Sequence, residues 1–160
     1  MHGTGGIQGN GQAWWEYYTT HMKADGDGRP ITLMLYCTTR GVIRNFSIQV
    51  QPFWCNTVTE SRNIVYDWMC CNARQRESRL RWDQGRRADA DAGINMFQSD
   101  HIALLNWDIT CGDDCLAIKG NSTNIVAKNI TCRGGNGIMF SSLGQYANLV
   151  HVSILLRCGC

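Results

Sequence analysis

The feature that most constrains the fold of this 160-residue chain is a recurring segment. Each copy begins with Ser, any residue, Asn or His, and Ile, continues as a short apolar-rich run and ends in Cys; the copies lie at 61–71, 99–111 and 122–132. The last two copies start 23 residues apart, and a looser copy lies at 42–54. β-Branched segments bounded by polar turn residues predict short strands. Repeats of this length that carry short strands stack as a solenoid.

The repeats therefore predict an all-β fold, a parallel β-helix, as a single domain over residues 1–160. A β-sandwich is the alternative, but hairpin signals are weak, because GDGRP at 26–30 is the only good turn cluster. The segment 12–22 predicts a helix with Trp14, Trp15 and Tyr18 on one face. Such a helix would cap the open end of a solenoid, which otherwise exposes a sheet edge.

Composition limits the partners and the cellular compartment that this chain can have. The net charge of +2 is too small to indicate a nucleic-acid partner, and no apolar run approaches the roughly 20 residues of a membrane span. Nine Cys without a clear zinc pattern favour an oxidising compartment. Three N-x-[ST] sequons agree with this, at Asn45, Asn121 and Asn129. We expect a secreted, glycosylated monomer, although the opening MHGTGGIQGNG has no signal-peptide pattern.

One segment does not fit the repeat. Residues 73–92 hold six of the 12 Arg in the chain and show no strand period. A solvated loop and an error in the predicted coding sequence are equally good interpretations. A basic nucleic-acid patch is a third, but four acids are mixed in and no aromatic ladder accompanies them.

Two adjacent carboxylates, Asp113 and Asp114, lie between Cys111 and Cys115. Gly-Asp and Asp-Asp are frequent in turns, so a bare GDD predicts a turn between strands. A metal loop is disfavoured, because C-x-x-x-C is not a good zinc spacing. Crowded carboxylates also raise one pKa, giving a proton donor beside an ionised base, as glycoside cleavage requires. Lys119, just after the acids, is either a solvated Lys or a contact for a substrate carboxylate.

The surrounding residues favour the acid/base interpretation. The run 106-NWDITCGDDCLAIKGNSTNI-125, followed by 132-CRGGNGIMFSSLGQY-146, resembles family 28 of the glycoside hydrolases, the polygalacturonases and rhamnogalacturonases. Residues 3–15 and 94–107 are similar to the same family. The resemblance implies a right-handed parallel β-helix, secretion, inverting hydrolysis of pectic polysaccharide, and no metal or organic cofactor. It also implies that Asp113 donates a proton to the leaving oxygen, that Asp114 helps a second Asp to activate water, and that Cys115 pairs with Cys132.

The chain departs from that family at three places. The second Asp belongs to an N-T-D-G motif, which matches 90-ADAG-93; without a gap its Asp falls on Ala92, and Asp91 serves only if a bulge re-aims it. Asn136 stands where polygalacturonases have His, and it cannot shuttle a proton. The family's later Arg-x-Lys is absent, since the chain stops at Cys160, and residues 149–160 do not resemble the family's continuation. By this resemblance, we expect a partial β-helix domain over residues 1–160 that lacks rungs at both ends.

These departures shape the expectation for function. We expect Asp113, Asp114 and Asp91 to be catalytic, and Asn136 and Lys119 to bind substrate. Asn136 favours an exo-acting or rhamnogalacturonan-type enzyme over a plain endo-polygalacturonase. His101 is expected to satisfy a turn rather than to catalyse. The alternative is a truncated, catalytically inactive β-helix that at most binds acidic polysaccharide. The preference between polygalacturonan and rhamnogalacturonan stays open.

Overall fold

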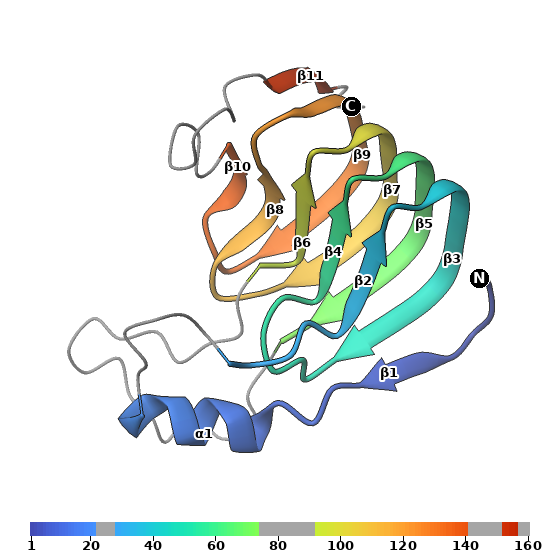
Figure 1. Ribbon diagram of the computed structural model, residues 1–160. Coiled ribbons are helices and arrows are strands. Elements are labelled where there is room, and N and C mark those ends of the chain that lie inside the picture. Colours follow the sequence, from blue (N-terminus) through green and yellow to red (C-terminus); the bar gives the residue numbers. More distant parts are fainter. Residues whose placement is uncertain (22–27, 74–91, 141–151, 157–160) are drawn as a thin grey trace.

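The computed structural model describes residues 1–21, 28–73, 92–140 and 152–156. This part of the chain contains the helix α1 (Gln12–Thr20) and a set of strands that wind into a coil (Figure 1). The strands are β1 (Gly6–Gln8), β2 (Leu33–Tyr36), β3 (Thr39–Gln49), β4 (Asn56–Thr59), β5 (Arg62–Asn72), β6 (Ile94–Phe97), β7 (Asp100–Thr110), β8 (Asp114–Ile118), β9 (Ser122–Arg133), β10 (Gly137–Phe140) and β11 (Val152–Leu156).

The strands form two sheets whose pairs are all parallel. One sheet has six strands in the order β1-β3-β5-β7-β9-β11 and contains the four strands of 11 or 12 residues, so we call it the long sheet. The other, the short sheet, has five strands of four or five residues in the order β10-β8-β6-β4-β2. From β2 onwards, strands of the short and the long sheet alternate along the chain, so each coil adds one strand to each sheet (Figure 1). The predicted parallel β-helix is confirmed. The β-sandwich alternative is wrong, because its sheets would be antiparallel.

The repeat is visible in the backbone as a column of left-handed residues in the long strands. Asn45, Trp68, Asn106 and Asn129 have φ of 52°, 55°, 55° and 54°. Their spacings are 23, 38 and 23 residues, so the middle coil holds 15 residues more than the others. That excess lies between β5 and β6, where 21 residues replace the six that join β3 to β4. The Arg-rich segment is thus an insertion into one connection of a coil that keeps its register; residues 74–91 lie outside the described part.

The core lies between the two sheets and is made of inward side chains of strands β3 to β9. Ile64, Tyr66, Leu104, Ile109 and Leu116 are fully buried there. In the long sheet, Ile43, Tyr66, Leu104 and Ala127 stand in register on successive strands. Because side chains alternate between the faces of a strand, this register gives each inward residue an inward neighbour in the next coil.

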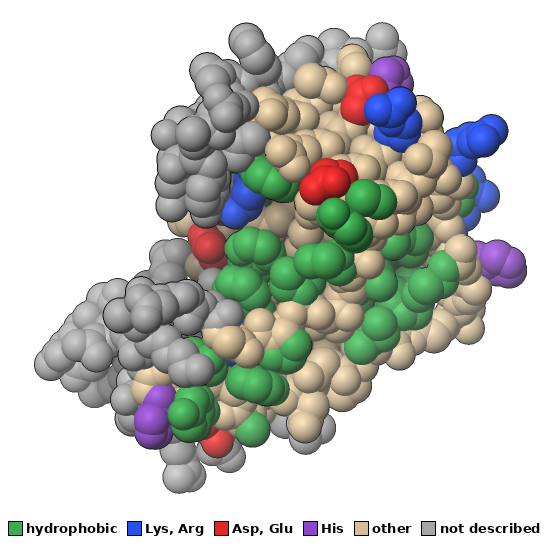
Figure 2. Space-filling model, in the orientation of Figure 1, with side chains coloured by type: hydrophobic (Ala, Val, Ile, Leu, Met, Phe, Trp, Pro, Cys, Tyr) green, Lys and Arg blue, Asp and Glu red, His purple; other side chains and the backbone are tan. Residues whose placement is uncertain are grey.

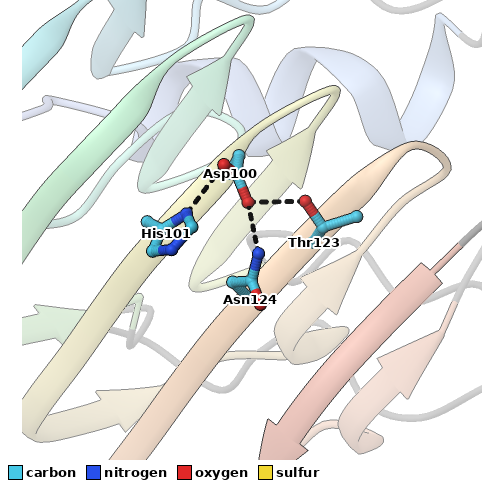
Figure 3. Close-up of polar contacts among 4 residues, drawn as sticks. All are labelled: Asp100, His101, Thr123 and Asn124. Atoms are coloured by element: carbon cyan, nitrogen blue, oxygen red, sulfur yellow. Dashed lines mark hydrogen bonds and ion pairs between the residues drawn. The ribbon is translucent and has the colours of Figure 1, made fainter.

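A polar cluster on the long sheet ties β7 to β9 (Figure 3). Oδ1 of Asp100 accepts hydrogen bonds from Thr123 Oγ1 at 2.6 Å and from Asn124 Nδ2 at 2.8 Å, and Oδ2 lies 2.7 Å from Nδ1 of His101. The bond from Thr123, followed by the bond from Asn124, holds the pKa of Asp100 well below its usual range. His101 lies in β7 and not in a turn, and its ring contacts the neighbouring Asp100. That it does not catalyse stays a prediction.

Helix α1 packs one aromatic side chain against the coil. Trp15 is fully buried against Val50 and Ala73, which directly follow β3 and β5. Trp14 is 37% exposed, and its ring stacks on that of Tyr18 with centroids 6.3 Å apart. The predicted helix is present, but the single shared face is wrong, because adjacent residues point about 100° apart on a helix. No helix in the described residues is long and apolar enough to cross a membrane.

Candidate active site

The structure brings Asp113, Asp114 and Asn136 together at the start of two neighbouring short strands. Asp113 lies in the bend before β8, and Asp114 is the first residue of β8. Gly137 begins β10 in register with Asp114, so Asn136 lies beside Asp113. The Asn136 backbone N–H donates to the Asp113 carbonyl at 2.9 Å. Its side-chain Nδ2 donates to Oδ1 of Asp113 at 3.0 Å and to Oδ1 of Asp114 at 3.1 Å.

This shared amide limits how far apart the two carboxylates lie. Both Oδ1 atoms are within 3.1 Å of one nitrogen, so they cannot be more than about 6 Å from one another. Inverting glycosidases hold their two carboxyls roughly 6.5–9.5 Å apart to leave room for water. The two side chains also interact with each other by a hydrogen bond. Asp113 and Asp114 are therefore too close to be the two partners of an inverting pair by themselves.

Two glycines let the turn before β10 approach the acids. Gly134 and Gly135 have φ of 74° and 66°, in the left-handed region that favours glycine. A side chain at Gly135 would collide with the Asp113 carbonyl oxygen, and one at Gly134 would meet the carbonyl of Cys111. The Gly-Gly pair before Asn136 is thus a steric requirement of the site.

Burial is the main influence on the protonation of Asp114. Asp114 is 8% exposed, and its burial raises the pKa above the ordinary value for Asp. The hydrogen bond from Asn136 opposes this, the charge of Asp113 adds to it, and Lys119 opposes it. Like-charge crowding, the reason inferred from the sequence, contributes less than burial. Because its pKa is raised, Asp114 takes up a proton more readily in the folded state than an ordinary Asp does.

Lys119 lies just after β8 on the same side as the acids. Its side chain is half-buried, and burial lowers the pKa of its ammonium, while the charges of Asp114 and Asp113 oppose that shift. Nζ lies 4.6 Å from the centre of the Trp54 ring. Sequence reasoning missed Trp54, because 65 residues separate it from Lys119 and no local motif marks it.

The expected third carboxylate is not among the described residues, because Asp91 lies outside them. Ala92 is described and is 2% exposed. Its carbonyl accepts from the Cys55 backbone N–H at 3.1 Å, and the next residue, Gly93, donates to the Asp114 carbonyl at 2.8 Å. A buried methyl group therefore occupies the position beside Asp114 on which the gap-free match would place an acid.

Three thiols surround the acid-bearing turn. Sγ of Cys111 lies 3.7 Å from Sγ of Cys115 and 3.4 Å from the Asp113 carbonyl oxygen. The contact with Cys111 lowers the pKa of Cys115, but the contact with Cys132 and burial outweigh it and raise that pKa to about 12. The same contact with Cys115 lowers the pKa of Cys132. Cys115 and Cys132 are thiols in contact, so their pairing stays a prediction.

A disulfide that the sequence did not assign joins Cys55, just before β4, to Cys71 in β5. It connects the two sheets within one coil, at the level of the buried core. Within the described ranges, no group of three His, Cys, Asp or Glu side chains is placed to hold a metal ion.

The three sequons differ in their surroundings. Asn45 and Asn129 are exposed on the long sheet, whereas Asn121 is half-buried in the turn between β8 and β9. Nδ2 of Asn129, the atom to which a glycan would attach, donates to Oδ1 of Asn106 at 2.7 Å. Glycosylation at these residues stays a prediction.

Known proteins resemble this chain in sequence, and solved structures resemble it in fold. A putative galacturan 1,4-alpha-galacturonidase A from Aspergillus niger is 40% identical over 144 residues, which are 89% of this chain and 32% of that protein. Exopolygalacturonase X from Aspergillus niger is 32% identical over 152 residues, covering 95% of this chain and 33% of that protein. This chain spans about a third of the length of these relatives.

Among solved structures, the endo-xylogalacturonan hydrolase from Aspergillus tubingensis superposes with a TM-score of 0.71 at 24% identity, over 86% of this chain and 35% of that one. This likeness supports the β-helix. The sequence profile described as "Glycosyl hydrolases family 28" matches residues 1–155. The chain therefore belongs to family 28 of the glycosyl hydrolases.

Proposed function

We propose that this chain carries the acid-bearing part of a secreted hydrolase that cleaves glycosidic bonds in pectin. The observation that carries the proposal is the pair of Asp113 and Asp114 joined by the Asn136 amide, with half-buried Lys119 on the same side. Asp113 is the proton donor to the leaving oxygen, and Asp114 helps to activate water. Lys119 supplies a cation for the carboxylate of an acidic sugar, because a buried carboxylate needs a positive partner.

The spacing of the two acids bears on the stereochemistry. They lie closer than the carboxyls of an inverting pair, so inversion needs a further carboxylate, and Asp91 is our candidate. The buried Ala92 supplies none. A separation of about 5–5.5 Å is typical of retaining enzymes, in which the second carboxylate attacks the sugar. Product anomer, measured by NMR during hydrolysis, distinguishes these cases; we expect inversion.

The names of similar proteins guide the choice of substrate. One of those relatives is described as a putative galacturan 1,4-alpha-galacturonidase and the other as an exopolygalacturonase. Asn136, which replaces the His expected of polygalacturonases, favours the same exo-acting branch or a rhamnogalacturonan-type enzyme. We propose removal of terminal residues from galacturonan-type chains by a monomer outside the cell, where a disulfide such as Cys55–Cys71 persists.

The test is release of reducing sugar from polygalacturonic acid and from rhamnogalacturonan by this chain and its Asp114→Asn variant. Activity that the substitution abolishes supports the proposal. A folded chain with no activity on either polymer overturns it. That outcome favours a second candidate, an inactive β-helix that binds acidic polysaccharide, for which the buried Ala92 is the supporting observation. Polygalacturonate retention on an affinity gel would then measure binding alone.

A further inference from the structure

The side chain of Lys119 lies against Trp54. The ammonium lies over the indole ring, 4.6 Å from its centre. It is near enough to Asp114 and Asp113 for their charges to act on it. Among the described ion pairs, none joins Lys119 to a carboxylate. A half-buried ammonium beside two carboxylates would ordinarily pair with one of them, because each charge needs compensation.

A ring stack and a backbone hydrogen bond fix the position of Trp54. The Phe53 ring stacks on it with centroids 4.6 Å apart and planes 18° from parallel, and the Trp54 carbonyl accepts from the Thr32 backbone N–H at 3.2 Å. Arg29 lies over the Phe53 ring at 4.7 Å and donates to the Pro52 carbonyl at 3.2 Å. Trp54 is thus part of an ordered stack, and it presents a fixed aromatic surface to Lys119.

The contact crosses one strand of the short sheet. Trp54 lies just before β4 and Lys119 just after β8, and β6 separates these two strands. Ile94 and Met96 of β6 point into the core, so Asn95 between them points to the outer face. Asn95 is nevertheless only 2% exposed, which shows that this outer position is covered. Trp54 precedes the start of β4 and Lys119 follows the end of β8, so their contact runs across the short sheet from one end of its strands to the other.

We infer that Trp54 is a positioning residue, which holds the Lys119 ammonium in a cation–π contact so that it does not form an ion pair with Asp114 and stays available for the carboxylate of an acidic sugar. The part of this inference that concerns an acidic sugar rests on the proposed function. The part that concerns the placement of Lys119 by Trp54 rests on the geometry alone. Trp binds a cation over its face better than Tyr or Phe does. Without the indole, the nearest compensation for the ammonium is the acid pair itself.

The groups that face these residues are few in the described structure. Asp113, Asp114 and the indole of Trp54 act on Lys119, and Asp113, Lys119 and the Asn136 amide act on Asp114. Releasing Lys119 toward Asp114 adds a positive charge beside that carboxylate and lowers its pKa. Removing the ammonium has the opposite effect.

The experiment follows the carboxyl carbon of Asp114 by NMR during a pH titration. Trp54→Leu should lower the pKa of Asp114, Trp54→Phe should lower it less, and Lys119→Gln should raise it. In the Lys119→Gln background, Trp54→Leu should have no further effect. Trp68→Leu, which removes a Trp 63% exposed on the other sheet, is the matched control and should change nothing. An unchanged or raised pKa in both Trp54 variants, or the same shift without Lys119, overturns the inference.

A kinetic measurement separates this inference from the proposed function. Pairing of Lys119 with Asp114 removes one charge-assisted contact to substrate, so KM for polygalacturonate should rise about tenfold in Trp54→Leu. A titration shift in a chain that never hydrolyses pectin leaves the role of Trp54 intact and refutes the activity. Turnover with no shift refutes the role of Trp54 and leaves the activity intact.

Discussion

Nδ2 of Asn136 donates to Oδ1 of Asp114 at 3.1 Å while also bonding Asp113. The bond is made to the charged form of Asp114 and lowers its pKa, against the larger effect of burial. Asn136 occupies the position at which a polygalacturonase-type His was expected. An amide there fixes the two carboxylates in place but cannot carry a proton between them.

We expect Asn136→Ala to raise the pKa of Asp114 further, because the bond that favours the carboxylate is lost. If Asp114 acts ionised, the acidic limb of the pH profile of kcat/KM should move to higher pH. Activity below that limb should fall about tenfold, the value of one hydrogen bond to a charged group. The measurement is hydrolysis of polygalacturonate across the pH range. Asn129→Gln is the control; equal profiles for Asn136→Ala and the unaltered chain would contradict the prediction.

We expect Asp114→Asn to make the fold more stable at neutral pH. When burial raises the pKa of an Asp in the folded state, the folded protein loses stability as the pH rises through that pKa, because the buried carboxyl must then become charged. Asparagine keeps the shape and removes the charge. A gain of about 1 kcal/mol corresponds to roughly 2–4 °C in Tm for a chain of this size. Thermal unfolding at pH 7 measures it, with the exposed, Arg133-paired Asp108 changed to Asn as the control. A lower Tm would count against the burial argument.

We expect the opposite effect on stability when Asp100 is replaced by Asn. Its pKa is depressed, chiefly by Thr123, so its contribution is present above the unfolded value of about 3.9 and is lost as pH falls through the folded pKa. Asp100→Asn should therefore lower the free energy of unfolding at pH 7. Between pH 5 and pH 2, the free energy of unfolding of the variant should fall less steeply than that of the unaltered chain. Urea unfolding at several pH values tests this. Parallel curves for the variant and the unaltered chain would exclude a role for the cluster in Figure 3.

We expect the double variant Cys55→Ala, Cys71→Ala to be less stable by about 3 kcal/mol, since the bridge closes a loop of 16 residues. Urea unfolding measures the loss, and reduction of the unaltered chain should reproduce it. Cys37→Ala, which removes an exposed thiol, should have no such effect. If reduction alone leaves the urea midpoint unchanged, Cys55 and Cys71 are not bonded in solution.

We expect the oxidised chain to link Cys115 to Cys132, which would tie the acid-bearing turn to the strand before Asn136. The two thiols already interact, and Cys111 is left to bond the Asp113 carbonyl. Peptide mapping without reduction identifies the partner of Cys115. A Cys111–Cys115 link, favoured by their 3.7 Å contact, is the competing result and would close a loop around the two acids.

Much of the fold followed from periodicity. The Ser-x-(Asn/His)-Ile segments predicted the long strands β5, β7 and β9, and all three lie within two residues of the expected ranges. Residues one coil apart become neighbours when the coils stack, so a 23-residue spacing in the sequence becomes a contact in space. Asp113 and Asn136 are 23 residues apart and meet in this way; the sequence placed them in one site through the family resemblance and not through this spacing.

The tertiary structure alone decided the contacts that do not follow this spacing. The sequence did not distinguish a solvated Lys119 from a functional one, did not show Trp54 beside it, and did not pair Cys55 with Cys71. These contacts arise in the connections between strands and across the sheet, where side-chain direction is set by local turns and not by the repeat. The sequence by itself determined the β-helix and pointed to Asp113 and Asp114. Which side chains surround these acids was decided only by the way the connections between strands pack against one another.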